Sequence, residues 1–213
     1  MRVDWYFDFI SPYSYFQSER LPQLPEGVTF RPRAIVFAGL LDHWGQKGPA
    51  EIAGKRAFTY RHCQWISRRD GIAFRFPPTH PFNPIRALRL AVAMDESMSA
   101  IHAIFRHVWA EGRHTDSEAD WSALAAAVGL APEEATARVN DPAVKARLIR
   151  NGQEAIEAGV FGVPTLLVDG VPFWGYDATA MAFEYIRDPD AFMDDEMKRV
   201  GALPVGVRRP GSA

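Results

Sequence analysis

The sequence predicts an α/β fold in which two strand-bearing ends enclose a long all-helical block. Strand-like segments occupy residues 1–37 and return only at residues 160–187. Residues 38–159, between them, show the three- and four-residue apolar spacing of helices instead. Residues 188–213 end in a stretch rich in Pro, Gly and Arg, and we expect them to form a loosely held C-terminal extension.

The N-terminal end is predicted to form a strand, a short helix and a second strand. Residues 2–10 alternate and are dense in β-branched and aromatic side chains, which is typical of a strand. Ser11 then suits the N-cap of a helix, and Pro12 suits its first position. Residues 28–36 form the second strand, where Pro32 indicates an edge because it cannot donate a backbone hydrogen bond. A unit this short implies parallel pairing of the two strands.

The central block is predicted to contain several amphipathic helices. Phe58, Trp65 and Ile66 recur at helical spacing, so we expect them to lie on a buried apolar face, with His62 beside them. Asn83-Pro84 and Asp141-Pro142 each place a capping residue before a proline, which favours the start of a helix.

The C-terminal strands are predicted to form a hairpin that a helix follows. Residues 164–168 and 171–174 are separated by Asp169-Gly170, a strong turn signal. Asp177 is expected to begin a helix that runs to Ile186. The order resembles the two halves of a thioredoxin-like fold, with a large all-helical subdomain inserted between them.

Composition and charge narrow the classes of function. The 213 residues include 24 basic and 26 acidic side chains, which leaves no charge excess to attract nucleic acid or an anionic membrane. No run of about 18 apolar residues could span a membrane, and Arg2 and Asp4 interrupt the N-terminus before a signal peptide could form. We therefore expect a soluble, cytoplasmic protein.

Cys63 is the only cysteine of the chain. A single cysteine excludes an internal disulfide, a Cys-x-x-Cys redox pair and a thiolate zinc site. The six histidines include no pair spaced with a glutamate as in a zinc protease helix, so no metal is expected. Cys63 itself is predicted to lie in mid-helix as a buried, inert thiol.

The segment Ser11-Pro12-Tyr13-Ser14 stands where thioredoxin-like oxidoreductases carry Cys-x-x-Cys, at the junction of a strand and a helix. A helix N-terminus stabilises a thiolate at that place. A serine hydroxyl cannot exchange disulfides, but it can donate a hydrogen bond to the thiolate of another molecule. The alternative is that Ser11 serves only as the helix cap.

The segment Gly162-Val163-Pro164-Thr165 opens a strand after the helical block. In thioredoxin-like proteins the matching X-Pro bond is cis and faces the helix N-terminus, and the residue before the proline offers its backbone to an extended peptide. Val163 would have this role here. A bound peptide with its own cysteine would supply the thiol that the chain lacks, and glutathione is the obvious candidate.

Residues 8–15, 161–165 and 173–177 resemble the motifs of 2-hydroxychromene-2-carboxylate isomerases. Those enzymes belong with the kappa-class glutathione transferases in the DsbA-like branch of the thioredoxin superfamily, and the resemblance covers residues 2–187. It implies that glutathione is the cofactor. It also implies a cis–trans isomerisation of a small aromatic or conjugated carbonyl or carboxylate compound and, by analogy with related proteins, a homodimer.

The resemblance also assigns the residues of the site. Ser11 is expected to contact the glutathione sulfur and is the predicted catalytic residue. Val163 would pair with the peptide backbone of glutathione, and Asp177 would hold its γ-glutamyl end. Pro164 and Trp174 complete the predicted cofactor site. The alternative for Asp177 is that it caps the helix that follows.

One stretch departs from the family, in which Phe-Lys-Ala-Thr-Gly-Asn follows the second strand and its lysine and asparagine face the substrate. Here Asp42 replaces the lysine and Gln46 the asparagine. Since an aspartate would repel a substrate carboxylate, another cation must compensate. His43, Gln46 and Lys55 are the predicted substrate-binding residues. Ala178 stands where the family has an arginine beside the acid, a change that would weaken glutathione binding.

Three functions remain open at this point. The first is the isomerase, which leaves glutathione unconsumed. The second is a kappa-like transferase that conjugates glutathione to an electrophile and so consumes it. The third is a thioredoxin-like protein that binds glutathione or an extended peptide without catalysis. Thiol–disulfide exchange is disfavoured because Cys63 is the only thiol.

Overall fold

A computed structural model describes residues 1–115 and 117–207. The N-terminal end contains β1 (Arg2–Phe7), α1 (Pro12–Ser18), η1 (Leu21–Gln23) and β2 (Thr29–Ala34). The central block contains α2 (Phe37–Trp44), η2 (Pro49–Glu51), α3 (Ala53–Asp70), α4 (Ile85–Ala93), α5 (Met98–Phe105), a π-helical turn η3 (Arg106–Ala110), α6 (Glu118–Ala127), α7 (Pro132–Asn140) and α8 (Pro142–Glu157). The C-terminal end contains β3 (Thr165–Val168), β4 (Val171–Trp174), α9 (Thr179–Arg187), η4 (Pro189–Phe192) and α10 (Asp195–Gly201).

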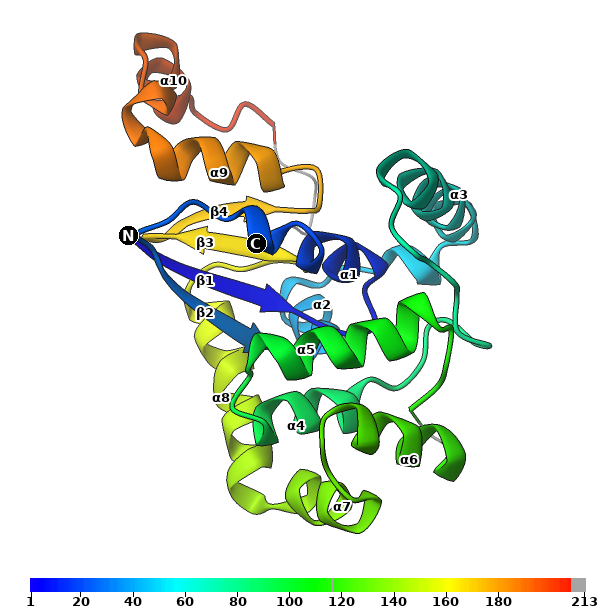
Figure 1. Ribbon diagram of the computed structural model, residues 1–213. Coiled ribbons are helices and arrows are strands. Elements are labelled where there is room, and N and C mark those ends of the chain that lie inside the picture. Colours follow the sequence, from blue (N-terminus) through cyan, green and yellow to red (C-terminus); the bar gives the residue numbers. More distant parts are fainter. Residues whose placement is uncertain (116, 208–213) are drawn as a thin grey trace.

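The strands form one mixed sheet in the order β2-β1-β3-β4. β1 pairs with β2 in parallel and with β3 in antiparallel orientation, and β3 and β4 form a hairpin. Asp169 and Gly170 turn the hairpin with positive φ angles of 46° and 91°. The predicted parallel unit, the edge position of β2 and the hairpin are all confirmed. Figure 1 shows the sheet at the centre, with α9 on one side and α4 to α8 gathered on the side of β2.

The two faces of the sheet bury different cores because successive side chains of a strand point to opposite faces. Trp5 and Phe7 of β1 join the larger core, together with side chains of α1, α4, α5 and α9. Tyr6 points to the other face, where it joins a smaller core with Leu40 of α2 and Ala155 of α8. The inserted helices therefore cover both faces of a sheet that the chain ends build.

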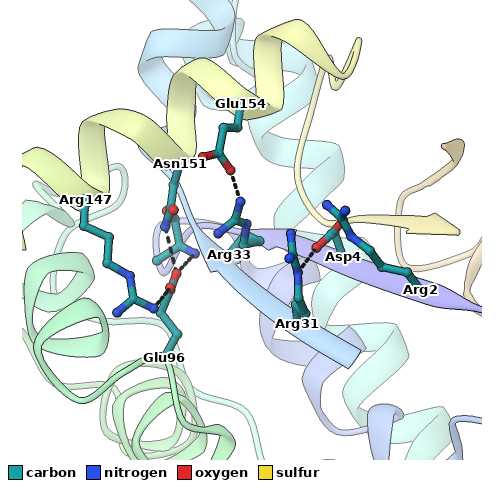
Figure 2. A network of polar contacts seen from close by, with 9 residues as sticks. Arg2, Asp4, Arg31, Arg33, Glu96, Arg147, Asn151 and Glu154 are labelled. Atoms are coloured by element: carbon teal, nitrogen blue, oxygen red, sulfur yellow. Dashed lines mark hydrogen bonds and ion pairs between the residues drawn. The ribbon is translucent and has the colours of Figure 1, made fainter. Parts of the chain in front are cut away.

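Side chains of the helical block also satisfy the open edge of β2 (Figure 2). The buried carboxylate of Glu96 accepts hydrogen bonds from the Ala34 amide at 2.6 Å, from Asn151 Nδ2 at 2.8 Å and from Arg147 at 2.7 Å. Asn151 Nδ2 also donates to the Ala34 carbonyl at 3.0 Å. Because Pro32 has no N–H to leave unpaired, this edge offers little to another strand.

The buried face of α3 is the predicted one only in part, because Ile66 is buried but Phe58 and Trp65 are not. Phe58 and Trp65 are 60% and 48% exposed, whereas Cys63 and Ile66 are buried. His62 stacks between the two exposed rings, with centroid distances of 5.6 and 5.7 Å. The prediction failed because helical spacing identifies a face but does not say which face the fold covers.

Two further expectations concern the C-terminal part and the membrane. The short helix α10 contains no buried residue, and residues 208–213 of the predicted loose extension lie outside the described residues. In the described ranges, no helix is both long enough and apolar enough to cross a membrane.

Candidate functional site

Three segments that are far apart in the sequence meet at one end of the sheet. β1 ends there, β3 begins there and β4 ends there, because β3 runs antiparallel to both of its neighbours. Tyr6 pairs with Thr165, and Thr165 pairs with Trp174. The Gly175 amide donates to the Pro164 carbonyl at 2.9 Å, which extends the pairing beyond the strands. The loops that carry Ser11, Val163 and Asp177 therefore leave the sheet at the same end.

Ser11 is the N-cap of α1, and its hydroxyl oxygen accepts a hydrogen bond from the Ser14 amide at 3.2 Å. The residue is 8% exposed. No acceptor for its hydroxyl proton is present among the described residues. Capping occupies a lone pair of the oxygen and leaves the proton free to be donated. The two interpretations of Ser11, as a cap and as a donor to a ligand, are therefore compatible.

The loop before Ser11 is tied to the start of α2 by a buried carboxyl group. Asp8 accepts from the Ile10 amide at 3.0 Å and from the Phe37 amide at 2.8 Å. The Asp8 carbonyl in turn accepts from the Ser11 amide at 3.1 Å. Burial raises the pKa of Asp8 to about 7, although its backbone hydrogen bonds act in the opposite direction.

Two side chains of the helical block hold the same loop from the other side. Trp109 Nε1 donates to the Phe9 carbonyl at 2.8 Å, and His80 Nε2 lies 3.0 Å from the Ile10 carbonyl. The sequence analysis did not identify either residue. They lie 100 and 70 positions from their partners in the chain, so no local pattern could have indicated these contacts.

Val163 presents backbone groups that the chain does not use. Its peptide bond to Pro164 is cis. Neither its N–H nor its C=O has a hydrogen-bond partner within the described part of the chain, although the residue is 8% exposed. Trp174 lies beside this loop, because a Cβ atom on Gly162 would come within 2.4 Å of its indole Nε1. The Trp174 ring also meets Phe161 edge to face at 5.2 Å.

Asp177 does not cap the following helix. α9 begins at Thr179, and its N-cap residue is Ala178, without a side-chain cap. The Asp177 carboxylate is exposed, and no hydrogen bond or ion pair to it is present among the described residues. It lies close enough to Tyr13 to help raise the pKa of that phenol to about 12, a shift that burial dominates. The capping alternative is therefore wrong.

The predicted substrate-binding residues lie on the surface of the helical block. His43 and Gln46 are exposed at the C-terminal end of α2, and Lys55 is exposed in the first turn of α3. Trp44 Nε1 donates to the Val160 carbonyl at 2.9 Å, so the end of α2 is docked on the segment that leads to Val163. Within the described ranges, no hydrogen bond joins these three side chains to Ser11.

Cys63 is buried, as predicted, and burial raises the pKa of its thiol to about 12. A thiol with this pKa stays protonated and unreactive at neutral pH. Any thiolate at this end of the sheet must therefore come from another molecule.

Comparisons with known proteins show which proteins the chain resembles in sequence and fold. A family model described as the DSBA-like thioredoxin domain matches residues 2–187. The chain is 26% identical to a 2-hydroxychromene-2-carboxylate isomerase of Sphingobium xenophagum, with 87% of this chain and 98% of the relative covered. It is 22% identical to glutathione S-transferase kappa 1 of Caenorhabditis elegans, with 91% and 94% covered. A solved structure of 2-hydroxychromene-2-carboxylate isomerase superposes with a TM-score of 0.75 at 26% identity, with 92% and 100% covered.

Proposed function

The chain belongs to the family of DsbA-like thioredoxin domains, and we propose that it is a glutathione-dependent cis–trans isomerase. Its substrate is a small aromatic or conjugated carbonyl or carboxylate compound similar to 2-hydroxychromene-2-carboxylate. The observation that carries the proposal is the spare proton of Ser11, at the same end of the sheet as the unpaired backbone groups of Val163. The isomerase relatives support it over most of the chain.

The residues at this end of the sheet fit glutathione group by group. Ser11 has a hydroxyl proton to donate to the sulfur, and Val163 has a free N–H and C=O for the cysteinyl backbone. The Asp177 carboxylate, which has no partner among residues 1–115 and 117–207, is available for the ammonium of the γ-glutamyl end. Unpaired backbone groups of a nearly buried residue are unfavourable unless a ligand or water pairs with them. A peptide with a cysteine satisfies all three residues at once.

A hydrogen bond from Ser11 is strong enough to account for the lowering of the pKa of the glutathione thiol. Free thiols have a pKa of about 8.5, and lowering it by about two units requires roughly 2.7 kcal/mol. A hydrogen bond to a charged group contributes about 1.5–3 kcal/mol, whereas a helix dipole contributes about 0.3–1 kcal/mol. Because α1 has only 7 residues, Ser11 supplies most of the stabilisation. When bound, glutathione supplies a thiolate that adds to a conjugated double bond and leaves again after rotation.

The test is to incubate the protein with glutathione and 2-hydroxychromene-2-carboxylate, following substrate absorbance and free thiol together. We expect isomerisation with the thiol preserved. Ser11→Ala should lower kcat/KM roughly 10- to 100-fold, the equivalent of one charge-assisted hydrogen bond. Ser14→Ala is the matched control, because the Ser14 hydroxyl is buried and has no hydrogen-bond partner. Full activity of Ser11→Ala would refute the proposed role.

The kappa-class relative favours a second candidate, a transferase that conjugates glutathione to an electrophile. The same assay separates the two, because a transferase consumes thiol in proportion to the adduct formed. Binding of glutathione without turnover of either kind of substrate would leave a non-catalytic binding protein. The homodimer stays a proposal by family analogy, and light scattering would test it.

A further inference from the structure

His80 lies between the helical block and the loop that carries Ser11. Its Nε2 is 3.0 Å from the Ile10 carbonyl, and its Nδ1 is 3.0 Å from the Tyr60 hydroxyl. A carbonyl oxygen can only accept, so Nε2 must carry a hydrogen. Burial lowers the pKa of His80, which favours the neutral ring at pH 7. With hydrogen on Nε2, the Nδ1 of the neutral ring is an acceptor; the Tyr60 hydroxyl lies 3.0 Å from Nδ1 and 3.0 Å from the His80 carbonyl, and its one proton can go to either.

The imidazole is confined by packing as well as by hydrogen bonds. The ring of His80 contacts four aromatic rings, with centroid distances between 5.5 and 6.4 Å; these belong to Trp109, Tyr60, Phe76 and Phe82. Three of the four come from segments of the helical block other than α3. A side chain enclosed in this way has few rotamers available, so its Nε2–H points in a defined direction.

The bond from His80 acts on the peptide plane immediately before Ser11. The carbonyl of that plane belongs to Ile10 and accepts from His80, and its N–H belongs to Ser11 and donates to the Asp8 carbonyl at 3.1 Å. Both sides of one planar unit are therefore held. The orientation of this plane sets the backbone of Ser11, which has φ −92° and ψ 113°, and with it the direction of the hydroxyl.

We propose that His80 is a positioning residue for Ser11: by donating to the Ile10 carbonyl, it aims the Ser11 hydroxyl at the bound sulfur. The Tyr60 hydroxyl, which is within reach of both Nδ1 and the His80 carbonyl, helps to hold this residue in place. This inference rests on the proposed function, since it names the residue that sets the geometry of the same site. In this proposal His80 acts through the Ile10 carbonyl and not by contact with glutathione or the substrate.

Two substitutions of His80 separate its hydrogen bond from its bulk. In His80→Gln the amide nitrogen stands as many bonds from Cβ as Nε2 does, so it can still donate to Ile10. In His80→Asn the same amide stops one atom short. We expect His80→Gln to keep glutathione binding and kcat within about threefold of wild type. His80→Asn should still bind glutathione but raise the pKa of the bound thiol by about one unit, which means roughly tenfold less thiolate at lower pH.

The readout is the ultraviolet absorbance of the thiolate, titrated on the protein–glutathione complex, with calorimetry for the affinity. The same His80→Asn change is then made in a Ser11→Ala background. A positioning role predicts that His80→Asn causes no further shift there, because the group that it aims is gone. The positioning role would be overturned if His80→Asn shifted the thiol pKa equally with Ser11 and with Ala at position 11. It would also be overturned if His80→Asn caused no shift in the protein that keeps Ser11.

The failure of the proposed function would look different. It would appear as wild-type protein that does not bind glutathione, or as Ser11→Ala with an unchanged thiol pKa. Should His80→Asn fail to fold, Tyr60→Phe takes its place, because it keeps the ring and removes only the hydroxyl. It should shift the thiol pKa in the same direction by a smaller amount, and an unchanged pKa would count against the proposal.

Discussion

Replacing Glu96 by glutamine should show how much the closed edge of β2 contributes to stability. The Glu96 side chain is 2% exposed and accepts hydrogen bonds from Ala34, Asn151 and Arg147 (Figure 2). Glutamine keeps the volume but has one acceptor oxygen and an NH₂ group. The NH₂ group must face at least one of the three donors, and the charge that pairs with Arg147 is lost.

The expected loss is about 2–4 kcal/mol, because a buried donor left facing the NH₂ group costs about 1–3 kcal/mol and the lost charge pair with Arg147, whose side chain is 36% exposed, costs about 1 kcal/mol. For a chain of this length, 1 kcal/mol corresponds to about 2–4 °C in Tm. Glu96→Gln should therefore lower Tm by roughly 4–16 °C. The loss should exceed that of an ordinary surface substitution, which stays within about 0.5 kcal/mol.

Asp95 provides the matched control, because the same arginine contacts it. Arg147 lies 3.1 Å from Asp95, whose side chain is 92% exposed, and 2.7 Å from buried Glu96. Both acidic residues have positive φ angles, 54° and 53°, so backbone strain does not distinguish them. Urea unfolding measures both variants at unchanged m-value. Equal losses of unfolding free energy in Glu96→Gln and Asp95→Asn, within about 0.5 kcal/mol, would show that burial of the Glu96 carboxylate does not add to stability. That result would refute the reasoning.

Three other changes test the site and its support. Asp8 has a pKa of about 7 in the folded protein, against 3.8 as the ordinary value. Between these two pH values the folded state therefore keeps a proton that the unfolded state has released. Stability from this group is therefore present at low pH and is lost as pH rises from about 4 to about 7, by up to about 4 kcal/mol. Asp8→Asn should remove this slope in urea unfolding at several pH values, whereas Asp42→Asn, on the exposed surface, should leave it. Gly162→Ala should displace the Trp174 indole, because the new Cβ would lie 2.4 Å from Nε1. We expect weaker glutathione binding and a change in tryptophan fluorescence, and if both stayed unchanged the contact would be contradicted. Gln17→Leu should lower stability by about 2–4 kcal/mol in thermal unfolding, since three hydrogen bonds, two of them buried, lose their partner; a loss below about 1 kcal/mol would show that water replaces the Gln17 amide.

Sequence patterns correctly predicted the turns, helix caps and edge strand, because these depend on interactions between residues that are close in the chain. Asp169-Gly170 forms the expected turn because its residues adopt positive φ angles readily. Ser11 caps α1 because a hydroxyl three residues before a free amide can accept from it. Pro32 lies on an edge strand because an inner strand would need its missing N–H.

The same patterns were wrong where tertiary packing decides which face of a helix is buried or at which residue a helix begins. On α3, Phe58, Trp65 and Ile66 were expected to share a buried face, yet the fold buries only Ile66 of the three, together with Cys63. The exposed side has its own partners, since the Tyr13 hydroxyl meets His62 at 2.8 Å. In the same way, α9 begins two residues after Asp177, which leaves that carboxylate unpaired within the described residues instead of capping the helix.

The sequence by itself determined the parallel strand unit, the hairpin, the serine in place of a redox cysteine and the single cysteine of the chain. Only the tertiary structure decided which distant groups hold that serine in place. Asp8 reaches the start of α2, and Trp109 and His80 reach back from the helical block to the loop before Ser11. The physical reason is that caps, turns and alternation arise between neighbours in the chain. A side chain that pairs with a distant carbonyl is selected only once packing has brought the two together.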